Sequence, residues 1–246
     1  MAAIAERAPR FRARSVFYSG IAAAIAVAVF FGFAHTFFLR GYVSLPTGFG
    51  PLSPLLLLHG VVATAWIGVF CLQTSLVAIG RTDLHRRLGV AGAGVAAAMF
   101  IVGAVVAIAA MRHHVEPFGI DRRVWFMGVT FPGILAFGSL VLAAVALRRR
   151  SEAHKRLMLL ATITLLAPAG GRLLAHNFDD VTLSGFLFAN FALPDVFVVA
   201  AVVYELWSRR RVHPALVLGG GALLLLPVLV VAAGTPTGLA LAELFL

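Results

Sequence analysis

Residues 54–111 decide the fold: PLLLLHGVVATAWIGVFCLQTSLVAI (54–79) is followed by GRTDLHRRL (80–88) and then by GVAGAGVAAAMFIVGAVVAIAAM (89–111). The first and last pieces are apolar runs longer than the about 20 residues that a helix needs to cross a bilayer core. The middle piece is short and basic and begins with a glycine. This order is typical of two transmembrane helices joined by a tight turn at the membrane surface.

The same pattern continues along the whole chain, which is 61% hydrophobic and only 12% charged. A soluble domain has roughly 25% charged residues, so no soluble fold of this size could bury so much apolar surface. We therefore predict an all-α polytopic membrane protein, with a basic segment at 1–15, a transmembrane domain at 16–233 and an interfacial C-terminal segment at 234–246. Seven predicted spans make up the domain: about 16–38, 54–79, 89–111, 124–147, 157–175, 186–207 and 214–233.

The Lys and Arg residues predict how the helices are oriented. Fifteen of the twenty lie before the first span or between spans two and three, four and five, and six and seven. Because basic loops stay in the cytoplasm, we expect a cytoplasmic N-terminus, an outside C-terminus and a multi-pass protein of the bacterial cell inner membrane.

The formal charge of +10 is therefore explained by orientation, and we expect no nucleic-acid partner. The single cysteine, Cys71, lies inside a span and allows no intramolecular disulfide. The sequence contains no phosphate-binding glycine loop, no Gly-x-Ser-x-Gly nucleophile and no His-Glu-x-x-His zinc motif. No lysine lies within a span, which argues against a retinal Schiff base. We accordingly name no catalytic residue and do not expect an enzyme.

Two turns share one pattern: Asp83-Leu-His-Arg-Arg-Leu88 and Glu152-Ala-His-Lys-Arg-Leu157. In one interpretation, His85 and His154 bind haem or a metal ion, whose identity the pattern leaves open. In the other, which we favour, the acidic residue caps a helix and the two basic residues meet lipid phosphates. The sequence does not say whether the two turns come together.

A second group of histidines is expected near the outer side of the membrane. His59, with Gly60 beside it to leave space for a flat ligand, and His35 lie at similar depth on different helices, as the axial ligands of a haem b do. Hydrogen bonds to backbone or water are the commoner role for interfacial histidines. The remaining outer histidines, the first two of which we expect in a solvated loop, are His113, His114 and His176.

Arg172 and Asp195 interrupt consecutive apolar spans. An isolated charge is costly in lipid, so we expect the two to form an intramembrane ion pair. Pro168 predicts a broken helix nearby. Glu205 is expected to pair with Arg209, one turn further along its own helix.

These motifs together resemble a group of uncharacterised bacterial seven-helix inner-membrane proteins. The resemblance covers residues from about 15 to 235 and implies seven helices with cytoplasmic basic turns, but it implies no activity. It is carried by Leu58-His-Gly60, Trp66, Gln73, Gly80-Arg-x-Asp-Leu-His-Arg-Arg-Leu-Gly89, His154-Lys-Arg-Leu-Met158 and Arg172.

Three hypotheses for function follow. The first, which we favour, is a non-catalytic accessory or structural subunit that packs against a larger respiratory or photosynthetic membrane complex, with lipid and other membrane subunits as partners. The second is a haem b electron-transfer protein ligated by histidines of the spans. The third is a small-solute or proton transporter built around Arg172 and Asp195.

Overall fold

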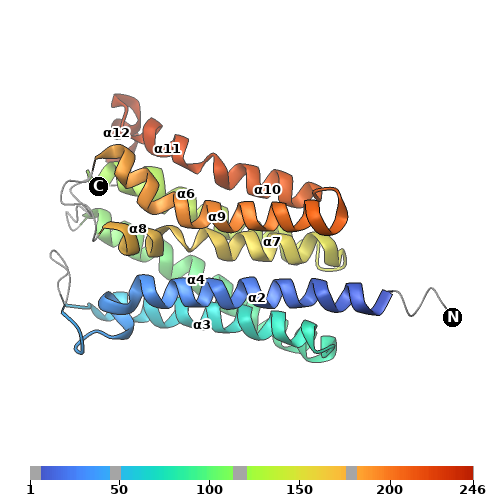
Figure 1. Ribbon diagram of the computed structural model, residues 1–246. Helices are drawn as coiled ribbons and strands as arrows, with labels where there is room; N and C mark the ends of the chain where they lie inside the picture. Colours follow the sequence, from blue (N-terminus) through green and yellow to red (C-terminus); the bar gives the residue numbers. More distant parts are fainter. Residues whose placement is uncertain (1–6, 45–50, 113–120, 176–181, 246) are drawn as a thin grey trace.

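The structure, a computed structural model, describes residues 7–44, 51–112, 121–175 and 182–245. The described chain is helical, and Figure 1 shows its long helices lying side by side as a bundle. Seven helical segments are long and apolar enough to cross a membrane, which confirms the predicted number and makes the chain a multi-pass membrane protein. They are Val16–Phe38, Pro54–Ala78, Thr82–Arg112, Arg123–Ala146, Ser151–Leu173, Ser184–Arg209 and Pro214–Ala233.

Several spans consist of more than one helical element. The first combines α2 (Arg7–Phe33) with the π-helix η1 (Ala34–Phe38), and the next two are α3 (Pro54–Ala78) and α4 (Thr82–Arg112). The fourth to seventh spans contain α5 (Arg122–Trp125), the π-helix η3 (Phe126–Thr130), α6 (Phe131–Ala146), α7 (Ser151–Thr164), α8 (Ala167–Ala175), α9 (Leu183–Arg209), α10 (Pro214–Leu224) and α11 (Leu226–Ala233).

Polar residues at the helix starts explain where several helices begin. Ser53 accepts a hydrogen bond from the backbone N–H of Leu56, and Thr182 does the same for Gly185. Each oxygen satisfies a backbone donor that the first helical turn leaves open. Pro54 and Pro214 follow their caps directly, where a missing N–H costs nothing.

The fifth span, α7 with α8, lies at the centre of the bundle. In its most apolar 18-residue stretch, 72% of the residues are buried, whereas in the other spans this share is at most 39%. The helix breaks between Thr164 and Ala167, as Pro168 predicted, because proline has no N–H to continue the ladder. A Cβ on Gly170 would lie 2.6 Å from the carbonyl oxygen of Ala189, so the glycine allows α8 to lie directly against α9.

The C-terminal segment folds back against the bundle as α12 (Pro236–Ala242) and the 3₁₀ turn η4 (Glu243–Phe245). Ala242 is fully buried beside Met111 and Phe126, and Glu243 forms an ion pair with Arg123 at 2.7 Å. The segment is therefore packed against the spans through both an apolar and a charged contact.

Candidate functional site

The repeated turns lie at one end of the bundle, where α4, α7 and α10 begin and α3, α6 and α9 end (Figure 1). We call this the basic end, because the Arg-rich connections between these helices are there. Two clusters of side chains form at the basic end, one of histidines and one of charges.

The histidine cluster joins the two repeated turns. His85, in the first turn of α4, and His154, in the first turn of α7, have ring centroids 6.3 Å apart and ring planes at 83°. The sequence left open whether these turns meet, and in the structure they do. Both rings are half-buried.

The neighbours of each ring determine which nitrogen carries hydrogen. Nδ1 of His154 lies 2.8 Å from the carbonyl oxygen of Ala144. A carbonyl only accepts, so Nδ1 is the donor and Nε2 of the neutral ring keeps its lone pair. The amide of Gln73 satisfies both of its neighbours when it donates to Nδ1 of His85 (2.5 Å) and accepts from the N–H of Gly89 (3.1 Å).

The two rings are close enough to hold one group between them. They meet edge to face, and their centroid separation of 6.3 Å lies in the ordinary range for two packed rings. Among the residues that the structure describes, no group of three or more His, Cys, Asp and Glu side chains lies close enough to hold a metal ion.

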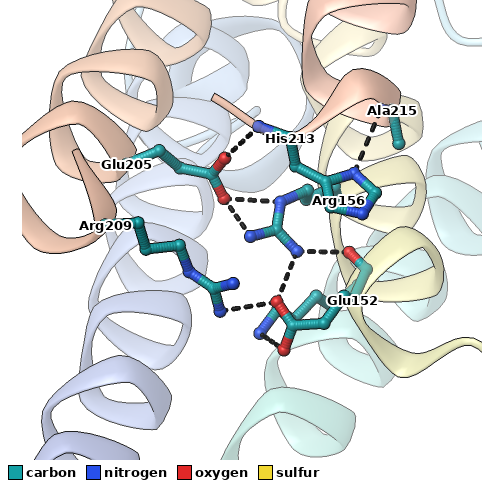
Figure 2. Close-up of polar contacts among 7 residues, drawn as sticks. Glu152, Arg156, Glu205, Arg209, His213 and Ala215 are labelled. Atoms are coloured by element: carbon teal, nitrogen blue, oxygen red, sulfur yellow. Dashed lines mark hydrogen bonds and ion pairs between the residues drawn. The ribbon is translucent and has the colours of Figure 1, made fainter. Parts of the chain in front are cut away.

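The charge cluster connects α7, α9 and the start of α10 (Figure 2). Arg156 and Glu205 form an ion pair with side chains only 1% and 3% exposed. Nε of Arg156 donates to Oε1 of Glu205 at 2.5 Å, and the backbone N–H of His213 donates to Oε2 at 2.8 Å. Both oxygens of this buried carboxylate are thus hydrogen-bonded, as a charge out of contact with water requires.

Glu152 forms the half-exposed part of the same cluster. Its carboxylate pairs with Lys155 at 2.8 Å, with Arg156 at 2.9 Å and with Arg209 at 2.5 Å. The expected pair of Glu205 with Arg209 is therefore wrong, because Glu205 is turned toward Arg156 while Arg209 reaches Glu152.

Arg156 also corrects the interpretation of its turn. We expected the two basic residues after each histidine to meet lipid phosphates, but Arg156 is buried against Glu205. The signal for this was present in Glu205, an acidic residue in an otherwise apolar span, which requires a cationic partner. Sequence spacing could not identify a partner 49 positions away.

Arg172 and Asp195 do not form the expected ion pair in the structure. Arg172 donates to the carbonyl oxygen of Pro168 at 3.0 Å, and its guanidinium lies 4.5 Å from the ring centroid of Phe33. Gly171 faces Asn190, so Asp195 lies more than one turn further along α9, toward the basic end. The two charges are on adjacent helices but at different depths.

The outer histidines have different surroundings. His59 points toward α4, since a Cβ on Gly103 would lie 3.8 Å from its Cε1, and its buried Nδ1 has no hydrogen-bond partner among the described residues. His35 lies exposed in η1. The space expected beside Gly60 is filled, because a Cβ there would lie 2.2 Å from Cε2 of Phe37. The other outer histidines fall outside the described residues: His113, His114 and His176.

Comparison of the chain with known protein families, curated proteins and solved structures found no match. The resemblance drawn from the turn motifs stays a prediction, and the function has to be argued from the site itself.

Proposed function

We propose that the protein is an electron-transfer protein of the bacterial inner membrane that binds one haem b between His85 and His154. The observation that supports this most is the 6.3 Å separation of the two ring centroids. Two histidines this close, one from each repeated turn, would hold the haem between them.

Haem suits this donor set better than a bare metal ion. The porphyrin supplies four nitrogen ligands, so two histidines complete the coordination of the iron. A bare Zn²⁺ with the same pair would need two further protein or water ligands. A bound haem b would supply one-electron exchange with redox partners.

The second nitrogen of His154 supports ligation through Nε2, and the second nitrogen of His85 is held by Gln73. Metal-binding histidines commonly donate their other N–H to a carbonyl or an amide, which orients the ring and raises its basicity. His154 already donates from Nδ1 to Ala144. Gln73 donates to Nδ1 of His85 and so orients that ring, which puts the hydrogen of the neutral ring on Nε2; ligation through Nε2 would displace this hydrogen.

The sequence repeat explains why the proposed site contains two equivalent histidines. Each copy of the acid-x-His-basic-basic-Leu turn would contribute one of the two histidines that hold the haem, from the first turn of α4 and of α7. With the basic end in the cytoplasm, as the distribution of Lys and Arg predicts, the haem would lie near the cytoplasmic surface.

The test is an absorption spectrum of the purified protein, oxidised and dithionite-reduced, after expression with haem supplied. We expect a sharp reduced α-band of haem b that is lost in His85→Ala and in His154→Ala. His35→Ala, which removes an exposed histidine elsewhere on the bundle, is the control and should keep the band. A colourless wild-type protein, or a band that survives both ligand substitutions, would refute the proposal.

The accessory-subunit hypothesis stays a prediction that the same gentle purification tests, because a stable partner complex would co-purify. The transport hypothesis, built around Arg172 and Asp195, also stays a prediction; in the structure Arg172 donates to the carbonyl oxygen of Pro168.

A further inference from the structure

The turn between α9 and α10 forms a cavity that is partly open to the surface at the basic end, apart from the histidine pair. Its volume is about 240 Å³, and it is lined by Arg209, Arg211, Val212, His213 and Pro214. Three of these five side chains carry N–H donors, and two are permanently cationic.

The donors are available from the side chains. Arg209 uses one guanidinium nitrogen for Glu152, which leaves its other N–H groups for a ligand. Arg211 is exposed and has no ion pair among the described residues. Nδ1 of His213 accepts from the N–H of Ala215 at 3.1 Å, so the neutral ring carries its hydrogen on Nε2. The N–H of Ala215 in the first turn of α10 is thus already satisfied, so a ligand would be bound by the side chains of Arg209, Arg211 and His213.

The surrounding charges leave a positive excess. Glu152 and Glu205 are the only carboxylates in the described ion pairs of this cluster, and they face Lys155, Arg156 and Arg209. Arg211 adds a fourth cation. The cavity therefore favours an anion, and guanidinium groups suit the oxygens of a phosphate in particular.

The position of the cavity indicates where that phosphate comes from. It lies at the junction of two candidate spans, Ser184–Arg209 and Pro214–Ala233, where the apolar part of the chain ends. Trp207, 80% exposed on the last turns of α9, is at the level where tryptophan meets lipid headgroups. Lipid phosphates lie at this level.

We propose that the cavity of Arg209, Arg211 and His213 is a binding site for the phosphate of an anionic phospholipid. Arg211 and the free N–H groups of Arg209 contact the phosphate oxygens, and Nε2–H of His213 donates to a third oxygen or to the headgroup. This site does not depend on haem binding.

The experiment measures binding of phosphatidylglycerol to the full-length protein in detergent by native mass spectrometry. Phosphatidylcholine, whose ammonium group the arginines repel, and inorganic phosphate are the comparison probes. We expect preferential binding of phosphatidylglycerol that falls about fivefold in Arg211→Gln, the loss typical of one arginine at a membrane surface.

The matched control is Arg149→Gln, which removes one exposed charge from the turn between α6 and α7 at the same end and should leave binding unchanged. Arg211→Lys, which keeps the charge but not the planar fork, should bind with intermediate affinity. Equal losses in Arg211→Gln and Arg149→Gln would overturn the proposal, since attraction would then be general to the surface. Displacement of the lipid by equimolar inorganic phosphate would overturn the lipid assignment.

Discussion

Glu205→Gln tests the buried ion pair that connects α7, α9 and α10. Glutamine keeps the size of the side chain and an oxygen that accepts from the N–H of His213, but it removes the negative charge opposite Arg156. Both partners are almost fully buried, so the remaining guanidinium is left without its counter-charge. Breaking a buried pair in this way costs about 3–5 kcal/mol.

For a chain of this length, that cost corresponds to a fall of roughly 6–20 °C in the thermal midpoint. The assay is thermal unfolding in detergent micelles, followed by the fluorescence of the buried Trp66 and by loss of the monodisperse chromatographic peak. Asp83→Asn is the control. It breaks the exposed Arg81–Asp83 pair at the same end of the bundle and should lower the midpoint far less.

A double variant, Arg156→Met with Glu205→Leu, separates the ion pair from general disruption. Because it leaves no unpaired buried charge, it should be more stable than Glu205→Gln alone. The reasoning would be refuted if Glu205→Gln matched Asp83→Asn, or if the double variant were the least stable of the set.

Three further predictions concern single positions. Partial burial lowers the pKa of His213, so the folded state binds fewer protons than the unfolded state. The stabilisation should therefore be complete above about pH 6.5 and decrease as the pH falls below it. His213→Asn, which keeps a helix cap, should flatten this dependence in thermal melts from pH 7.5 to 5.5. A Cβ on Gly32 would lie 2.7–2.9 Å from Ala169, so Gly32→Ala should destabilise by about 1–3 kcal/mol in denaturant titrations, whereas Gly20→Ala on the same helix meets nothing within 4 Å and should not destabilise. Arg210 has a φ of 59° at the end of α9, so Arg210→Gly should raise stability by about 1 kcal/mol, and a lower midpoint would contradict this.

The histidine pair shows how far local sequence can predict a site. The repeated motif identified His85 and His154 as equivalent residues, because both follow an acidic helix start and precede two basic residues. Their meeting depends on how α4 and α7 are placed in the bundle, which no local pattern encodes. The support from Gln73 and Ala144 was likewise invisible, since each comes from a neighbouring helix.

The pair expected from Arg172 and Asp195 likewise depends on how two helices are placed against each other. Each charge is an exception in an apolar span, and their position on consecutive spans predicts that the two are neighbours. Their depths differ, however, because the glycines of α8 set its level against Ala189 and Asn190 of α9. Arg172 instead contacts Pro168 and Phe33.

The sequence by itself determined that this is a membrane protein of seven helices, because the length of an apolar run is set directly by the thickness of the bilayer. It also determined where the helices turn and where one of them breaks, since caps and proline act within a few residues. Only the tertiary structure decided which charges pair and which histidines meet. A buried charge requires a partner but accepts any that packing brings within reach, and that choice is made between helices far apart in the chain.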